Sequence, residues 1–503
     1  MLKGLLLGSV TGLVAAAGAQ AADMPGTAPR IQYVKICSLH GDGFYYIPGT
    51  DTCIKLGGYL RIQVEYNAGA GGTAVGSGSP EAAQARFARD VTNDINHRTR
   101  AALSWDVRQE TEYGTLRTYL RFGLQVTTPA DSQAGVGFWN RAFMQFAGFT
   151  VGRSQSLFDL FTYDGAYSYH TVTVSGDTAA TGVAVWAYTA RFGNGFSGTL
   201  SLEDPRGHIR AATVDASAAA FGVNAAVTGD TAFADQAATL NGFRVPDVIA
   251  NLRVDQDWGF AGISGALHDA SGAYYGATNN VANGHPADKL GWAVAVGGKL
   301  NLPGGDMIGA NACYAEGSAG FCAGIGAGMQ IYNASTSVGV GWLTDAVFDT
   351  GTAVELTRVW SAVAAYEHVW NPKWRTSWFG GYVNVSYTDA AKTIINAHMP
   401  GEGGTVVCGV PVTGTTLPPI TLPAGGGGNS CNPDFSFYEI GSRTQWNPAP
   451  QLDIGLQVLY SHLTSAYKGP GVYPANTPRP AIAFIDDQNV WSAMFRWQRN
   501  FYP

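Results

Sequence analysis

The sequence predicts an all-β fold, a transmembrane antiparallel β-barrel of about sixteen strands, from alternating segments, an unusual composition and an N-terminal export signal. In residues 54–66 the apolar and polar side chains divide strictly by parity: Ile54, Leu56, Leu60, Ile62, Val64 and Tyr66 against Lys55, Arg61, Gln63 and Glu65. Because successive side chains of a strand point to opposite faces, this segment predicts a strand that separates an apolar from a polar medium.

The same division recurs in the next two segments, residues 97–108 and 115–125. Their apolar faces hold Leu103, Trp105 and Val107, then Leu116, Leu120, Phe122 and Leu124; their polar faces hold Arg98, Arg100, Asp106 and Arg108, then Arg117, Tyr119, Arg121 and Gln125. Every charge obeys the strand parity, whereas a helix would scatter them over several faces. We therefore expect consecutive amphipathic strands.

The composition indicates which apolar medium the strands face. The 503 residues include 66 Gly, 12% aromatic and only 13% charged residues, whereas soluble chains carry about a quarter charged residues. Low charge with a mean hydropathy near zero is typical of a barrel with lipid outside and a few polar groups inside. A large soluble β-sandwich or repeat protein is the alternative.

The N-terminus favours the membrane barrel. Residues 1–21 hold a basic start at Lys3, a short apolar run and the small-x-small site Ala19-Gln20-Ala21, which predicts a cleaved signal peptide and a mature start at Ala22. The apolar run is too short for an anchor through about 30 Å of hydrocarbon. An exported chain without a predicted spanning helix indicates an outer-membrane barrel, since only helices and closed barrels satisfy their backbones in lipid.

The six cysteines fit an oxidising compartment, because their number is even and they fall as sequence neighbours. Local pairing predicts three disulfides: Cys37 with Cys53, Cys313 with Cys322, and Cys408 with Cys431. Fifteen pairings are formally possible for six cysteines. The absence of a Cys-x-x-Cys motif speaks against a structural zinc or redox site, and we expect the bridges to restrain the N-terminal segment and two surface loops.

Short and long connections alternate along the chain and give the strand count. The short ones are residues 111–114, 147–149, 193–195, 256–259, 301–305, 371–374 and 447–450; the long ones are 68–96, 127–138, 154–181, 205–245, 270–289, 315–357, 388–434 and 464–486. This rhythm predicts about sixteen strands, with short turns at the periplasm and long loops outside the cell. The region 315–357 is the least regular and has room for an extra strand pair.

The last segment predicts a lipid-facing strand that closes the barrel. Trp491, Phe495, Trp497 and Phe501 share one parity, and pairing with the first strand would leave no exposed edge. Aromatic residues near other strand ends predict belts at the membrane surfaces: Trp258, Trp292, Trp370, Trp374 and Trp446.

Three segments together resemble the alphaproteobacterial porins. These are residues 33–61 (YVKICSLHGDGFYYIPGTDTCIKLGGYLR), 141–153 (RAFMQFAGFTVGR) and 366–375 (YEHVWNPKWR). The resemblance implies a homotrimeric, sixteen-stranded general-diffusion porin of the outer membrane whose third long loop folds into the lumen. The chain then divides into a signal peptide (1–21), an N-terminal segment with a disulfide (22–53) and the barrel (54–503).

The predicted pore lining follows from the polar parity of the first four strands. Seven arginines take the lumen parity: Arg61, Arg98, Arg100, Arg108, Arg117, Arg121 and Arg141. The third long loop carries Asp159, Asp164 and Asp177, so an inward fold would oppose carboxylates to the arginines and set up a transverse field. Alternatively, the arginines pair with lumen acids such as Glu65 and Asp106 and only stiffen the wall, and the aspartates lie on a solvated outer loop.

The sequence predicts a passive channel for small hydrophilic solutes and ions rather than an enzyme. It holds no nucleophile elbow, zinc-protease or phosphate-loop motif, and no cofactor or metal site is predicted. A net charge of −7 speaks against nucleic-acid binding, and outer-membrane lipid and lipopolysaccharide are the expected surroundings. The alternatives are a substrate-specific channel with an aromatic path that includes Tyr59 and Tyr119, a barrel hydrolase, and a surface adhesin.

Overall fold

The structure is a computed structural model. It describes residues 35–66, 95–128, 135–161, 167–169, 182–207, 213–217, 244–277, 280–323, 328–333, 337–397, 416–417, 420–421, 430–473 and 482–501. The predicted signal peptide, residues 1–21, lies outside them. Among the helices of these residues, none is long and apolar enough to cross a membrane.

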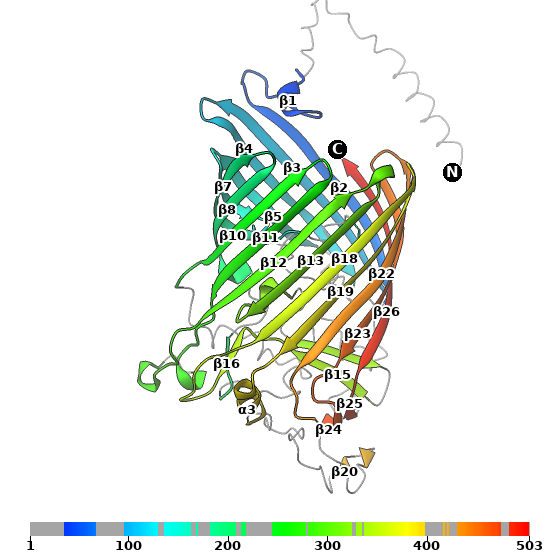
Figure 1. Cartoon of the computed structure of the whole chain (residues 1–503). Helices are drawn as coiled ribbons and strands as arrows, with labels where there is room; N and C mark the ends of the chain where they lie inside the picture. The colour runs from blue at the N-terminus through cyan, green and yellow to red at the C-terminus, as the bar shows by residue number, and fades with distance from the viewer. Residues whose placement is uncertain are drawn as a thin grey trace, which may run out of the picture.

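The described strands form a closed antiparallel barrel (Figure 1). Its sixteen wall strands are β2 (Cys53–Tyr66), β3 (Ile95–Thr111), β4 (Gly114–Thr128), β5 (Val136–Phe146), β6 (Phe149–Ser154), β7 (Val183–Gly193), β8 (Phe196–Glu203), β10 (Asp247–Gln256), β11 (Gly259–Asp269), β12 (Leu290–Asn301), β13 (Met307–Glu316), β18 (Arg358–Asn371), β19 (Trp374–Ser386), β22 (Phe435–Ala449), β23 (Leu452–Thr464) and β26 (Gln488–Phe501). Each strand pairs with the next, and β26 pairs with β2 from Gly58↔Phe501 to Tyr66↔Ala493. The predicted strand number and closure are confirmed.

The outer face of the barrel is apolar and the inner face polar, as the sequence parity predicts. Ile62 and Val64 on β2 are 41% and 40% exposed, whereas Gln63 and Glu65 between them are 2% and 0% exposed. The last strand follows the same rule, with its four predicted aromatic residues exposed: Trp491, Phe495, Trp497 and Phe501. The five predicted belt tryptophans are also exposed. An apolar exterior of this kind fits lipid.

Short turns gather at one rim of the barrel and long loops at the other (Figure 1). At the loop rim lie the small sheets β14 (Gly328–Asn333), β15 (Ser337–Trp342), β25 (Ile482–Ile485) and β24 (Gly469–Tyr473), and β17 (Glu355–Leu356), β16 (Ala346–Phe348) and β9 (Thr213–Asp215), with α3 (Asp389–Ala397), β20 (Thr416–Leu417) and β21 (Ile420–Thr421). The irregular region 315–357 thus carries four short strands outside the barrel wall. Buried apolar side chains from these loops pack against the inner face of the wall, for example Phe321 and Ile395 with Val383.

The remaining elements are single turns and one short strand. They are η1 (Ser38–His40), β1 (Tyr45–Tyr46), η3 (Pro205–Gly207), η6 (Tyr275–Ala277), η7 (Val281–Asn283), η8 (Pro303–Gly305) and η9 (Ala319–Phe321). The β3–β4 turn uses Gly114 at φ 103°, a backbone conformation that side chains with a Cβ disfavour.

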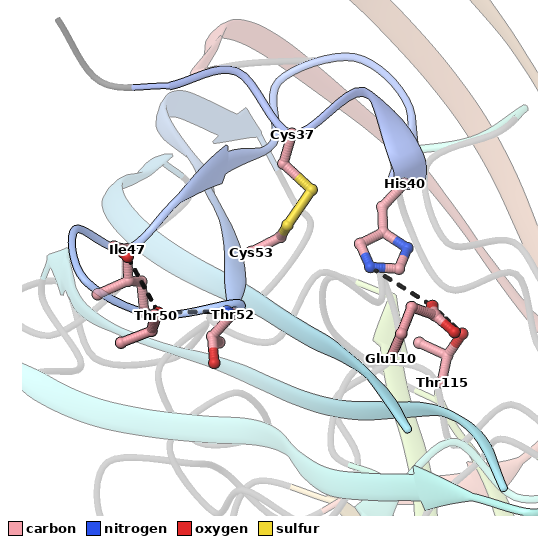
Figure 2. Close-up of a disulfide and its surroundings, with 8 residues drawn as sticks. All are labelled: Cys37, His40, Ile47, Thr50, Thr52, Cys53, Glu110 and Thr115. Atoms are coloured by element: carbon pink, nitrogen blue, oxygen red, sulfur yellow. Dashed lines mark hydrogen bonds and ion pairs between the residues drawn. A yellow bond between two sulfur atoms is a disulfide. The ribbon is translucent and has the colours of Figure 1, made fainter. Parts of the chain in front are cut away.

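A disulfide attaches the N-terminal segment to the rim of the barrel that carries the short turns. Figure 2 shows the Cys37–Cys53 disulfide and the His40 imidazole, whose Nε2 lies 3.7 Å from Oε1 of Glu110. A second bridge joins Cys313 to Cys322. Cys313 lies within β13, so this bridge ties η9 to the wall and does not sit wholly in a surface loop. Cys431 is disulfide-bonded, and its predicted partner Cys408 lies outside the described residues.

Candidate functional site

The seven predicted arginines all lie on the inner face of β2 to β5, opposite the exposed apolar side chains: Arg61, Arg98, Arg100, Arg108, Arg117, Arg121 and Arg141. The strand register brings them together across the sheet. Arg61 stands directly opposite Arg100, Arg108 opposite Arg117, and Arg121 opposite Arg141. The result is one strongly basic wall, as the parity predicts.

Arg98, Arg108 and Arg117 pair with lumen carboxylates that the structure describes. Asp106 accepts from Arg108 Nη2 at 2.8 Å and from Arg117 Nη2 at 2.9 Å, so one carboxylate bridges a pair of guanidinium groups. Arg98 Nη1 lies 4.0 Å from Oε1 of the buried Glu65. For these three side chains, the wall-stiffening interpretation accounts for the contacts.

Arg61 and Arg100 have neutral partners instead. Arg61 donates to Gln498 and Arg100 to Gln125, both on neighbouring strands. Tyr59 lies between them, with the Arg61 guanidinium 4.7 Å from its ring centroid. Tyr59 itself is only 6% exposed, so its ring offers little surface to solutes in the lumen.

The described start of the third long loop runs inside the barrel. Leu157 donates its backbone N–H to Glu203 Oε1 on β8 at 2.9 Å, and the Phe158 ring packs edge-on against Phe321 at 4.8 Å. Phe161 enters a space left by Gly309 on β13, where an added Cβ would lie 2.1 Å from the ring. The loop therefore crosses from β6 toward the opposite wall, as the resemblance implies.

The next described loop residues, 167–169, are fixed to the far wall by hydrogen bonds. Gln457 on β23 accepts from the backbone N–H of Tyr169 at 2.6 Å and from the Ser168 hydroxyl at 3.2 Å. Arg496 on β26 donates to the Tyr169 carbonyl at 2.8 Å, and Ser377 on β19 donates to the carbonyl of Tyr167. These contacts hold the loop across the lumen and narrow it.

Comparison with known sequences identifies the family. The profile of the porin subfamily matches residues 27–494. The chain belongs to this family. Porin Omp2a of Brucella melitensis is 35% identical over 226 residues, 40% of this chain and 56% of that protein. Porin Omp2b of Brucella suis biovar 1 is 32% identical over 269 residues, 51% of this chain and 63% of that protein.

The matched region thus spans between half and two thirds of these relatives. Among solved structures, the outer membrane channel DcaP of Acinetobacter baumannii superimposes with a TM-score of 0.54 at 11% identity, over 91% of this chain and 99% of that one. At this identity the likeness shows the barrel fold alone. The predicted resemblance to alphaproteobacterial porins is confirmed.

The porin carries a second basic cluster that sequence reasoning missed. Arg443 on β22 is 1% exposed and forms an ion pair with Glu367 on β18. The Tyr169 ring lies between two guanidinium groups, 5.2 Å from that of Arg443 and 4.0 Å from that of Arg496. The signal was present, since Arg496 takes the opposite parity to Trp491 and Phe495. Nothing in the sequence, however, paired it with the loop.

Of the three predicted loop acids, the described residues include only Asp159. It is half-buried between Phe158 and Leu160, and its backbone N–H donates to Ser156 at 3.3 Å. Asp164 and Asp177 lie outside the described residues. The expected opposition of loop carboxylates to the arginine wall therefore stays a prediction.

One cluster in the described part of the porin has metal-ligand spacing, namely Cys37, His40 and Cys53. Its two sulfur atoms are bonded to each other and cannot act as thiolate ligands (Figure 2). The residues instead fix the N-terminal segment on the rim.

Proposed function

We propose that this porin is a passive diffusion channel of the outer membrane for small hydrophilic solutes and ions. The carrying observation is a closed barrel with an apolar exterior, a charged interior and a third loop fixed across its lumen. Such a neck admits solutes by size and favours those whose polar groups replace lost hydration. The family membership supports a channel and not an enzyme.

The proposed neck lies between the basic wall and the third loop. The lining residues would be Arg61, Arg98, Arg100, Arg108, Arg117, Arg121 and Arg141, with Asp159, Asp164 and Asp177 on the loop. Arginines on one side and carboxylates on the other would create a transverse field, which orients dipolar solutes and disfavours apolar ones.

The assembly and export of the chain are also proposals. Homotrimerisation and contact with lipopolysaccharide rest on the family, and an exposed row of aromatic rings on β3 to β5 supports a protein contact there. We further propose that residues 1–21 are a cleaved signal peptide, that 22–53 form the disulfide-bonded N-terminal segment and that 54–503 form the barrel. Mass spectrometry of the mature N-terminus tests the cleavage at Ala22.

The test of the channel is single-channel recording of the folded protein in a planar bilayer. Ohmic conductance steps in groups of three would support an open trimeric pore. A silent bilayer with correctly folded protein would contradict it and lead to assays for hydrolysis and adhesion. Saturable block by one class of solute would favour a substrate-specific channel.

A further inference from the structure

Two arginines of the basic wall are direct cross-strand partners, and among the described residues no carboxylate bridges them. Arg61 on β2 is the direct cross-strand partner of Arg100 on β3, and like charges in this position repel. Arg61 Nε donates to Gln498 Oε1 at 2.7 Å, and Arg100 Nε donates to Gln125 Oε1 at 2.9 Å. Amide oxygens orient these guanidinium groups but leave their charge in place.

A second arginine pair on the same wall shows how a carboxylate offsets such repulsion. Arg108 and Arg117 are also direct cross-strand partners, and both bind Asp106. Both pairs consist of arginines directly opposite each other on adjacent strands of the same wall. They differ in their partners, since a carboxylate bridges Arg108 and Arg117. In the part of the chain that the structure describes, the pair of Arg61 and Arg100 has no carboxylate in the position that Asp106 takes between Arg108 and Arg117.

Two described lumen acids on β2 and β23 are already engaged with other side chains. Glu65 is fully buried and binds Gln63 and Arg98. Asp453, two strands away from Arg61, accepts from the side-chain amides of Gln445, Asn447 and Asn500. Within the described part of the chain, neither Arg61 nor Arg100 forms an ion pair with either acid.

Tyr59 holds the pair in a fixed arrangement. Its ring stacks under the guanidinium groups of Arg61 and Arg121, at 4.7 and 5.3 Å, and its hydroxyl is hydrogen-bonded to Arg100. The tyrosine is buried, whereas Arg61 and Arg100 are half-buried and keep an accessible side toward the lumen. Planar guanidinium groups that are already oriented lose little entropy when they bind an oxyanion by two parallel hydrogen bonds.

We propose that Arg61 and Arg100 form a binding site for small oxyanions, the carboxylate or phosphate groups of permeating solutes. The proposal rests on the channel function and adds a preferred substrate class to it. An oxyanion between the two guanidinium groups takes the place that Asp106 takes between Arg108 and Arg117. Because the site lies on the pore wall, a passing anion occupies it only briefly. Binding is then detected in two ways, as a preference of the channel for anions and as a block of the current by the bound anion.

The test measures reversal potential in a potassium chloride gradient and the block of chloride current by inorganic phosphate. We expect the variant R61Q/R100Q to lower the chloride-to-potassium permeability ratio about threefold or more and to lose phosphate block. R61K/R100K should restore the permeability ratio but not the block, because lysine keeps the charge without the planar fork. The matched control is Arg253→Gln, which removes a lumen-facing cation that is already paired with Asp255 at 2.8 Å, and it should leave the block unchanged.

The outcomes separate this site from the channel itself. If the wild-type protein conducts, and R61Q/R100Q keeps both the chloride-to-potassium permeability ratio and the phosphate block, the oxyanion site is refuted and the channel function is not. An equal loss of phosphate block in Arg253→Gln would also refute the oxyanion site, because the block would then depend on the total positive charge of the lumen and not on these two arginines. A wild-type protein without any steps would instead contradict the channel.

Discussion

At the scale of single residues, we expect Asp106 to limit the positive charge that the basic wall presents to solutes. Its carboxylate bridges Arg108 and Arg117, which are direct partners on β3 and β4, and offsets one of their two positive charges. We expect Asp106→Asn to raise the anion-to-cation permeability ratio and to lower thermal stability, because two guanidinium groups lose their shared partner. Reversal potentials and thermal unfolding in detergent measure the two effects. Asp255→Asn, in an exposed pair with Arg253, is the control, and an equal shift there would refute the special role of Asp106.

The sequence predicts which arginines face the lumen but not which of them are neutralised. Parity alone places Arg61 and Arg98 on the same face of one barrel. Their partners, however, come from other strands: Gln498 is 437 positions from Arg61, and Glu65 reaches Arg98 only through the β2–β3 register. Register depends on the whole barrel, so the partner of each of these arginines becomes visible only in the structure.

At the scale of elements, the third loop is fixed to the barrel wall at its start and again at residues 168–169. Glu203 holds its start, and Gln457 with Arg496 holds residues 168–169. Deletion of residues 156–175 should raise single-channel conductance, because it removes the loop from the lumen. Gln457→Ala should raise it less, since it removes two hydrogen bonds and leaves the Arg496 contact. If the deletion variant has the same conductance as the wild type, the loop does not lie in the conduction path.

The inward fold of this loop was predicted from family resemblance and not from the residues. A physical signal does exist, since Gly309 and Gly455 sit at lumen positions of β13 and β23 where a Cβ would lie 2.1 Å from Phe161 and from Tyr169. A glycine on the inner face of a strand marks a close approach. The sequence does not say which segment approaches, because the contacts join residues more than a hundred positions apart.

A buried acid in the sixth long loop, residues 315–357, holds this loop in place. Its titration predicts that the stability of the protein depends on pH. Asp345 accepts from the Ala319 backbone N–H at 2.6 Å and lies 3.9 Å from His268 Nε2 on β11. Burial raises the pKa of Asp345 to about 7, despite attraction to His268. Between pH 4 and 7 the folded state therefore holds a proton that the unfolded state releases, so stability falls as pH rises through this window.

We expect the thermal unfolding temperature to be higher at pH 5 than at pH 8, and Asp345→Asn to reduce that difference. Asparagine keeps an acceptor for Ala319 and does not titrate. Thermal scans of the folded protein in detergent measure both. Identical pH profiles for wild type and Asp345→Asn would show that another group sets the dependence.

At the scale of the whole molecule, the rhythm of short and long connections was sufficient to predict a sixteen-stranded barrel and its closure. The long amphipathic strands were readable because each faces two media along its whole length. The small sheets at the loop rim were not, because strands such as β16 (Ala346–Phe348) are three residues long and buried throughout. Their pairing, parallel in β16–β9, joins loops that lie far apart in the sequence.

The aromatic exterior of β3 to β5 is the surface that we propose for the contact between protomers. On β3, β4 and β5 the rings of Trp105, Phe122 and Trp139 form a continuous outward-facing row, with centroid distances of 5.9 and 5.6 Å. Exposed aromatic clusters of this kind serve as anchors in protein interfaces. We expect Trp139→Ala to lower the temperature at which trimers dissociate in detergent, measured by light scattering.

The control for this prediction is Trp360→Ala on β18. Trp360 is 45% exposed and packs on Tyr382 at 4.8 Å, so it matches Trp139 in residue type, exposure and aromatic contact but belongs to another part of the wall. If β3 to β5 meet a second copy, only Trp139→Ala changes the dissociation temperature, because Trp360 keeps lipid or detergent as its neighbour. Equal effects of the two substitutions would place the protomer contact elsewhere, and a wild-type protein that is monomeric at all temperatures would contradict the trimer.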